Sequence, residues 1–272
     1  MTITTFYFSG TGNSKWAANK LQEFLIRKGI KNDVFSIEKQ INEIPDLLAS
    51  TNGIAFIFPV YGMNIPENMK GFMKSLNNFK RKNRKKWPFF VITTFGYVDG
   101  CGPYEVMRQL DSKQFRLVGY TGLKMANNIC TPASYNEPII EEEFEKRLVI
   151  ATAKIQKLAS KISNGKRKID FGMYFFVGPF RKKMAKMVEN GFNKLSIDEK
   201  RCTKCMLCVN NCPVGAIVSK EGKLVITSKC VACMRCYNNC PTYAVLHGGQ
   251  FADPQKYPRY KGPVFESVHH KY

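Results

Sequence analysis

Eight of the ten cysteines lie in one short stretch of the chain, in two runs that share the spacing Cys-x2-Cys-x2-Cys-x3-Cys-Pro. The first run holds Cys202, Cys205, Cys208 and Cys212, and the second holds Cys230, Cys233, Cys236 and Cys240. Disulfides belong to oxidising compartments, whereas thiolates at such short intervals are typical of metal ligands. The spacing therefore predicts that this stretch binds metal.

Two kinds of metal site compete for these cysteines. Zinc takes a tetrahedron of four ligands, usually as CxxC pairs, whereas three cysteines at x2 spacing can wrap three iron corners of a [4Fe-4S] cube. The doubled run resembles the bacterial two-cluster ferredoxins, in which the fourth cysteine of each run binds the other cluster. The resemblance implies one [4Fe-4S] cluster on Cys202, Cys205, Cys208 and Cys240, and a second on Cys230, Cys233, Cys236 and Cys212.

A second group of candidate residues lies near the N-terminus, between a predicted strand and a predicted helix. Its glycines let backbone N–H groups approach an anion, and the start of a helix favours negative charge. The segment lacks the third glycine of a Rossmann fingerprint and the Gly-Lys-Ser/Thr ending of a Walker A motif. We interpret it as a phosphate-binding loop, with an ordinary Ser/Gly turn as the alternative. The candidate residues are Ser9, Gly10, Thr11, Gly12, Asn13 and Ser14.

Strands and helices alternate along the first part of the chain, which predicts an α/β fold with a doubly wound parallel sheet. Strands are expected at 2–8, 33–37, 53–58, 89–95 and 116–124, and helices at 15–28, 67–76, 104–110 and 137–163. Five such strands fit the order 2-1-3-4-5, in which ligands bind at the carboxyl ends of the strands. The loops after the first, third and fourth strands are therefore expected to meet at one edge.

The pattern Ser9-x-Thr11-Gly12-x-Ser14 resembles the phosphate loop of flavodoxins, and the resemblance covers roughly residues 1–160. It implies that FMN binds, with Tyr61 or Tyr97 stacking on the ring, although the aromatic residues are spaced differently from those of short-chain flavodoxins. The alternative for Tyr61 and Tyr97 is that they are surface aromatics, and Cys101 is interpreted as a loop-packing cysteine rather than a catalytic thiol. The implied ring contacts are Pro59, Tyr61, Gly62, Met63 and Asn64 on one side, and Thr94, Phe95, Gly96, Tyr97, Gly100, Cys101 and Gly102 on the other.

Four segments are expected along the chain. They are a flavodoxin-like FMN-binding domain at 1–165, a linker at 166–195, a small α+β two-cluster ferredoxin domain at 196–248 and a C-terminal tail at 249–272. The ferredoxin domain is expected to contain a hairpin. The linker carries an apolar stretch, Phe171–Phe180, that is too short to span a bilayer. We interpret it as packing between the domains, with a dimer contact or a membrane-surface element as alternatives, and expect a short helix over Met184–Leu195.

The charge balance is strongly basic, with 42 Lys and Arg against 21 Asp and Glu, or +21. Such a field favours acidic partners, and the lack of a recognition motif argues against nucleic acid. The basic run at 80–86 is interpreted as a solvated loop, with docking of an acidic partner as the alternative. Neither a signal peptide nor an apolar run of transmembrane length is visible, so we expect a cytoplasmic protein.

The two halves together resemble the flavodoxin–ferredoxin fusion proteins of anaerobic bacteria, over nearly the whole chain to about residue 248. The resemblance implies an electron relay between two [4Fe-4S] clusters and FMN, which exchanges electrons with a redox protein partner. An electron carrier is the favoured hypothesis. The alternative is a ferredoxin-dependent, flavin reductase-type enzyme that reduces a small molecule at the FMN.

Overall fold

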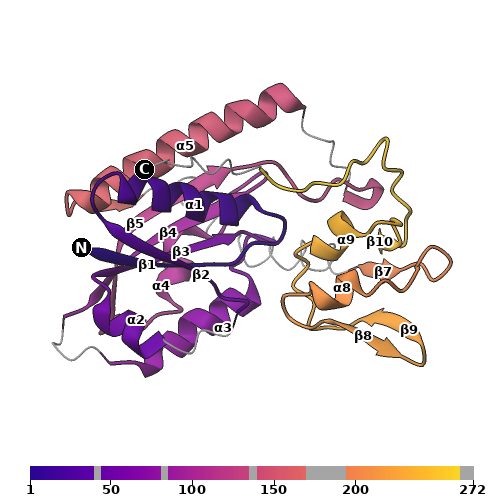
Figure 1. The fold of residues 1–272 in the computed structure, drawn as a ribbon, viewed down its shortest axis with the longest axis horizontal. Helices are drawn as coiled ribbons and strands as arrows, with labels where there is room; N and C mark the ends of the chain where they lie inside the picture. The colour runs from indigo at the N-terminus through magenta and orange to yellow at the C-terminus, as the bar shows by residue number, and fades with distance from the viewer. Residues whose placement is uncertain (40–43, 81–84, 135–139, 170–193, 264–272) are drawn as a thin grey trace, which may run out of the picture.

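The computed structural model describes residues 1–39, 44–80, 85–134, 140–169 and 194–263. These residues form two domains that lie side by side, with the larger one built on a parallel sheet (Figure 1). The apolar stretch Phe171–Phe180, most of the expected helix at 184–195 and the middle of the basic run at 80–86 lie outside the described residues. Within the described residues, no helix combines the length and the apolar character needed to cross a bilayer.

The sheet of the larger domain has the strand order β2-β1-β3-β4-β5-β6, and all its pairings are parallel. The predicted order 2-1-3-4-5 is confirmed, and a short sixth strand that was not predicted extends the edge beyond β5. The strands are β1 (Thr2–Tyr7), β2 (Lys31–Ser36), β3 (Gly53–Pro59), β4 (Trp87–Phe95), β5 (Phe115–Lys124) and β6 (Lys168–Ile169).

Helices cover both faces of this sheet (Figure 1). On one face lie α1 (Asn13–Ile26) and α5 (Glu141–Ser163), and on the other lie α2 (Ile44–Ser50), α3 (Glu67–Ser75) and α4 (Gly102–Met107). Because β3 is covered on both sides, its first six residues are all buried, as a continuous apolar run in a parallel sheet requires. The buried residues of α5 are Ala151, Ile155, Leu158, Ala159 and Ile162, a helical spacing that gives the helix one apolar face.

The smaller domain is built from two short helices and two antiparallel strand pairs. Strand β7 (Leu195–Ile197) pairs with β10 (Val245–His247), and β8 (Ile217–Lys220) pairs with β9 (Lys223–Ile226). The predicted hairpin is confirmed, and its two-residue turn has φ of 50° at Glu221 and 75° at Gly222, as a tight hairpin turn requires. The helices are α8 (Leu207–Asn210) and α9 (Arg235–Asn239).

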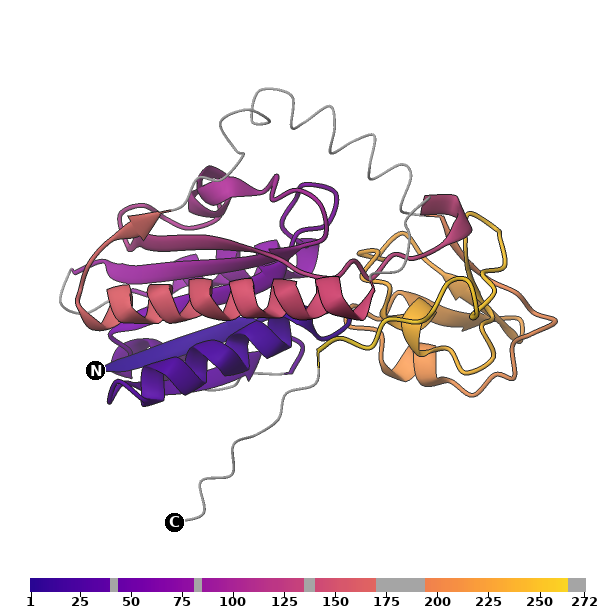
Figure 2. The ribbon, with the colours of Figure 1, turned by 90° about the horizontal axis from the view of Figure 1, so that it is seen from above.

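After β10 the chain turns back to the larger domain. Figures 1 and 2 both show this C-terminal segment, in yellow, running from the smaller domain to the boundary between the two. The sequence pattern of this segment predicted only a C-terminal tail. Its contacts with the N-terminal loop, described below, make it part of the structure that joins the domains.

Candidate redox site

A cavity of about 620 Å³ lies at the carboxyl ends of β1, β3 and β4, between the two domains. Its volume falls in the range of small-molecule and cofactor sites, about 300–1,000 Å³. The larger domain lines it with residues from the loops after β1, β3, β4 and β5, and the smaller domain with one loop. The residues from the smaller domain are Ser228, Lys229, Cys230, Val231 and Ala232.

Most of the predicted flavin contacts lie around this cavity. Those that line it are Ser9, Gly10, Thr11, Asn13, Ser14, Pro59, Tyr61, Gly62, Met63, Asn64, Thr94, Phe95, Gly96 and Tyr97. Gly12, Gly100, Cys101 and Gly102 are not among the lining residues. Cys101 is fully buried in the apolar core beneath, and Gly100 packs against the Met63 side chain, so both shape the wall from behind.

Sequence reasoning missed the loop after β5, where Ala126, Asn127, Asn128 and Ile129 also line the cavity. Its position could have been inferred, because β5 ends at the same sheet edge as the other strands. The residues themselves carry no glycine-rich or aromatic signal. This loop contacts both domains, because the Ala126 carbonyl accepts from Asn13 and Asn128 donates to the Cys233 carbonyl.

The N-terminal loop is held by hydrogen bonds to its neighbours. Gly12, with φ of 110°, donates its N–H to Ser9 Oγ at 3.1 Å, and the Ser14 and Thr94 hydroxyls lie 2.8 Å apart. Asn13 Nδ2 donates to the Ala126 carbonyl at 3.0 Å. The first bond of α1 runs from the Trp16 amide to the Gly12 carbonyl, so the amides before it have no partner within the helix. Such amides are the donors that an anion takes at a helix start.

The loop after β4 is fixed by the buried carboxyl of Asp99. Its oxygens accept hydrogen bonds from Thr93 Oγ1 at 2.9 Å and from the Tyr120 hydroxyl at 3.1 Å. Burial raises the pKa of Asp99, an effect that these hydrogen bonds oppose. This anchor holds the chain between Phe95 and Cys101 in place, and with it the wall that carries Tyr97.

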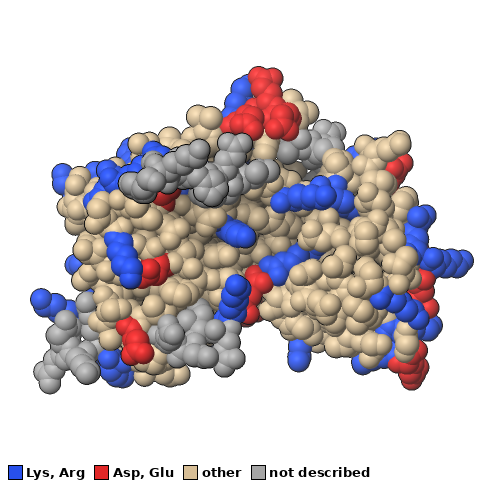
Figure 3. All heavy atoms as spheres, viewed as in Figure 1, with Lys and Arg blue, Asp and Glu red and all other residues tan. Residues whose placement is uncertain are grey.

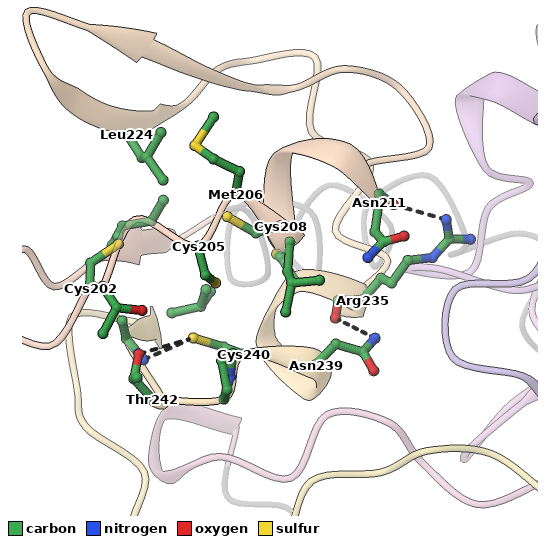
Figure 4. Close-up of a pocket in the computed structure, with 17 residues that line it drawn as sticks. Cys202, Cys205, Met206, Cys208, Asn211, Leu224, Arg235, Asn239, Cys240 and Thr242 are labelled. Atoms are coloured by element: carbon green, nitrogen blue, oxygen red, sulfur yellow. Dashed lines mark hydrogen bonds between the residues drawn. The ribbon is translucent and has the colours of Figure 1, made fainter.

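Five cysteines from the two runs line a second pocket, inside the smaller domain. Cys202, Cys205 and Cys208 of the first run and Cys240 of the second line it together, and Figure 4 shows their sulfur atoms around one hollow. Cys236 also lines this pocket. The set of four is the one that crossed ligation implies for one cluster.

The remaining four cysteines influence one another electrostatically. Burial raises the pKa of the Cys233 thiol to about 11, and neighbouring Cys230 and Cys212 add to the shift. Burial also raises the pKa of Cys236, with Cys233 and Cys230 as its strongest thiol neighbours. A metal cluster that binds the thiolates offsets this mutual repulsion. These four are the second set that crossed ligation implies.

The backbone repeats the same conformation in both runs. Non-glycine residues with left-handed φ precede and follow the middle cysteine of each triplet: Lys204 and Met206 in the first, Ala232 and Met234 in the second. Such angles cost free energy in ordinary chains, and they turn the backbone around the sulfurs here. Backbone amides donate to sulfur from Ala216 to Cys212, from Ala232 to Cys230 and from Ala244 to Cys240, at 3.1, 3.4 and 3.2 Å.

These amide donors are the hydrogen bonds that iron–sulfur clusters use. In the described part of the chain, no group of three or more His, Cys, Asp or Glu side chains is arranged to hold a metal ion. A cubane places its four cysteines on separate irons, so it does not need them within reach of one ion. The pocket at the first set, the amide donors to sulfurs of both sets and the repeated backbone fit iron–sulfur clusters.

The second cysteine run packs directly on the N-terminal loop. Cys233 is only 7% exposed and belongs to the same apolar cluster as Phe8 and Tyr61. Asn128 Nδ2 donates to the Cys233 carbonyl at 3.2 Å. The sulfurs of the second set are therefore the ones beside the cavity, and Cys230 lines it.

Arg235, between two of these cysteines, connects the domains through all its guanidinium nitrogens. It donates to the Ser9 carbonyl at 2.6 Å, to the Gly10 carbonyl at 3.0 Å and to the Asn211 carbonyl at 2.9 Å. It also donates to both carboxylate oxygens of Glu38, at 2.6 and 2.7 Å. One side chain thereby holds the N-terminal loop, the end of the β2 region and both cysteine runs.

Arg235→Gln is expected to destabilise the protein by about 1–3 kcal/mol, because it leaves Glu38 and two loop carbonyls without their donor. Arg235 and Glu38 are 18% and 21% exposed, so solvent screens the pair only in part. The measurement is the free energy of unfolding in denaturant. Arg201→Gln is the control, because its pair with Asp198 is more exposed and should contribute at most about 1 kcal/mol. Equal losses in both variants would contradict the assigned role of Arg235.

The C-terminal segment lies on the outer side of the N-terminal loop. The Tyr260 hydroxyl donates to Asn13 Oδ1, and the Tyr260 amide donates to Asn238 Oδ1 at 2.8 Å. Gly262 packs so closely on the Thr11 and Gly12 backbone that a side chain there would clash. The segment therefore contacts the N-terminal loop and the second cysteine run together.

Residues 195–245 match the family model described as a 4Fe-4S dicluster domain. No curated protein matches the chain. Among solved structures, the chain is similar to a flavodoxin of Streptococcus pneumonia TIGR4, with 13% identity over 61% of this chain and 99% of that chain and a TM-score of 0.44. It is also similar to Megasphaera elsdenii flavodoxin, with 18% identity over 56% of this chain and 98% of that chain and a TM-score of 0.38.

We assign the fold of the larger domain from its strand order and not from these similarities, whose TM-scores are low. That order is the flavodoxin-like one. The chain thus joins a flavodoxin-like domain to a 4Fe-4S dicluster domain, which confirms the predicted combination. An iron–sulfur domain of this type supports an electron-transfer or other redox role.

Proposed function

We propose that the protein binds FMN in the cavity and two [4Fe-4S] clusters in the smaller domain, and that it transfers electrons between them. The observation that carries this proposal is the shared wall. The loop that contains Cys230 lines the same cavity as the N-terminal loop and the loops after β3 and β4. A flavin in this cavity lies directly beside the second set of cysteines.

The residues around the cavity suit FMN. The amides at the start of α1 and the hydroxyl of Thr11 are donors for the phosphate, and the loops that carry Tyr61 and Tyr97 enclose the ring. FMN supplies chemistry in which one or two electrons are accepted. The protein orients the flavin, and Cys233, packed against Tyr61, keeps a cluster ligand close to it.

The order of the centres follows from the two sets of cysteines. The cluster on Cys212, Cys230, Cys233 and Cys236 is the proximal one, beside FMN, and the cluster on Cys202, Cys205, Cys208 and Cys240 is the distal one. Cys205 is the exposed member of the distal set. A redox partner that docks there would exchange electrons with the distal cluster first.

The charge of the protein favours an acidic partner. On the face in Figure 3, Lys and Arg side chains are spread over both domains rather than gathered in one patch. The charge therefore supports general electrostatic steering. We place the protein in a reducing compartment such as the cytoplasm, where free thiolates remain available for iron.

A reductase that acts on a small molecule at the flavin is the second candidate, and Tyr97 favours it. This residue lines the cavity and is 62% exposed, so one side of the cavity is accessible to solvent. The shared wall favours the carrier, because the smaller domain covers the other side. The steady-state rate at which the reduced protein is oxidised can be measured with small-molecule acceptors and with protein acceptors. A higher rate with the small molecules would support the reductase.

Anaerobic purification is expected to yield about eight irons, eight sulfides and one FMN per chain. The measurements are metal and sulfide analysis together with flavin fluorescence after denaturation. Zinc in place of iron would overturn the cluster assignment. A protein that remains free of flavin after incubation with FMN would overturn the assignment of the cavity.

A further inference from the structure

Arg259, in the C-terminal segment, has a guanidinium group that is enclosed by aromatic rings. Its Cζ lies 3.6 Å from the centroid of the Tyr237 ring and 5.0 Å from that of the Tyr243 ring. All three guanidinium nitrogens are buried, and none has a hydrogen-bond partner among the described residues. Burial lowers the pKa of Arg259 to about 10.

A buried cation without a partner is costly in free energy, and cation–π contacts offset only part of that cost. No acidic side chain in the described ranges forms an ion pair with Arg259, whereas Arg235 and Arg201 each have one. The five donors of a guanidinium are normally satisfied when the group is buried. The Cys130 thiol lies near enough to act on Arg259 and raises its pKa, but burial raises the pKa of Cys130 itself and so favours the neutral thiol. The described surroundings of Arg259 therefore lack a carboxylate that would offset its charge.

The rings that enclose Arg259 belong to the segments that carry the cysteines. Tyr237 is 1% exposed and lies in α9, directly after Cys236 and three residues before Cys240. Both cysteines pack against the apolar group that contains Tyr237. Tyr243 follows Cys240 in the next turn, and its amide donates to the Cys240 carbonyl at 3.3 Å. Arg259 is thus one aromatic layer away from ligands of both sets.

Bound clusters would supply the missing negative charge. Four thiolates on a 2+ core leave a net charge of about −2 on each cluster. We propose that Arg259 is the fixed counter-charge of the two clusters and that it raises their reduction potentials, an inference that rests on the proposed function. Reduction adds a negative charge to a cluster, and a nearby cation in a region of low dielectric constant favours that state. Arg259 acts through space and touches no reacting atom, so it is a positioning residue.

The test compares reduction potentials in the full chain loaded with its clusters. Arg259→Met keeps the length and apolar contacts of the side chain without its charge, and Arg259→Lys keeps the charge. In an anaerobic titration followed by electron spin resonance, Arg259→Met is expected to make reduction of at least one cluster about tenfold less favourable, a shift of 59 mV. Arg259→Lys is expected to remain close to the parent protein.

Lys256→Met is the matched control. Lys256 lies in the same segment, and its Nζ is 5.6 Å from the centroid of the Tyr257 ring. Unlike the guanidinium of Arg259, Lys256 is exposed to solvent. Water screens an exposed charge, so the loss of Lys256 is expected to leave both potentials unchanged. Equal shifts in Lys256→Met and Arg259→Met would show a general effect of net charge and would overturn the role given to Arg259.

The remaining outcomes separate this inference from the proposed function. A parent protein without clusters would refute the proposed function itself. Full iron content in Arg259→Met with unchanged potentials would refute only the role of Arg259. If Arg259→Met and Arg259→Gln fail to incorporate iron while Arg259→Lys succeeds, the positive charge is required and the inference holds. If all three fail, the side chain serves packing alone and the inference is wrong.

Discussion

Cys212→Ser is expected to slow electron exchange between FMN and the remaining cluster by orders of magnitude, whereas Cys240→Ser is expected to leave this exchange fast. Under crossed ligation, Cys212 belongs to the proximal set, of which Cys230 lines the cavity. Cys240 belongs to the distal set, beside Cys202, Cys205 and Cys208 (Figure 4). Loss of the proximal cluster leaves only the distal cluster. Electrons must then cross the longer distance between FMN and that cluster in one step. Loss of the distal cluster leaves FMN and the proximal cluster next to each other.

In each variant a flash of light reduces the flavin. The measurement is the rate at which the absorbance of the remaining cluster then bleaches. Both variants should contain FMN and about half of the parental iron, which checks that one cluster is lost in each. Cys130→Ala, a cysteine outside both runs, is the control that should keep all the iron. If Cys240→Ser proves to be the slow variant, each run binds its own cluster and the crossed assignment is wrong.

Gly10→Ala is expected to separate the second cysteine run from the N-terminal loop and to weaken FMN binding strongly. A Cβ at this position would lie 2.5 Å from the Cys233 carbonyl oxygen and even closer to the Tyr61 hydroxyl. Because the carbonyl is backbone, it cannot turn aside as the end of a long side chain would. Overpacking of this kind typically costs about 1–3 kcal/mol, and here the strain falls on the cavity wall.

Gly71→Ala is the matched control, because Gly71 lies within α3 and a Cβ there would meet no atom within 4 Å. It is expected to stabilise the protein by up to about 1 kcal/mol, since alanine favours helix. The measurements are the FMN dissociation constant, from the quenching of flavin fluorescence, and the unfolding temperature. Unchanged FMN binding in Gly10→Ala would show that the two loops are not held together as described.

The sequence pattern was sufficient for the elements that depend on local chemistry. The β-branched and aromatic residues of β1 and β4 and the apolar run of β3 predicted strands that are buried on both faces of a parallel sheet. The cysteine spacing predicted a metal-binding stretch, because a triplet at x2 spacing can bind one cluster, whereas the assignment of the fourth cysteine of each run came from the resemblance to two-cluster ferredoxins and stays a prediction. Short elements such as α2 and β6 were missed, since a few residues of ordinary composition give no periodic signal.

Contacts between the domains could not be predicted from the sequence. Arg235 reads as an ordinary residue between two cysteines, and only the fold shows that its donors reach Ser9 and Gly10. Cys101 was placed at the flavin because it follows a glycine-rich loop, but the chain already turns into the core before it, so that α4 can begin at Gly102. Tyr260 carries no motif at all.

The contact between Tyr260 and Asn13 joins residues that are 247 positions apart. A ribosome makes about 5–20 residues per second, so the N-terminal loop emerges long before the segment that covers it. The sheet can fold early, yet the cavity wall is complete only after the loop at 228–232 has docked, and the N-terminal loop gains its contact with Tyr260 later still. Under the proposed function, flavin capture is therefore expected to be a late step in the biogenesis of this protein, and cells starved of iron are expected to accumulate chains that lack flavin as well as clusters.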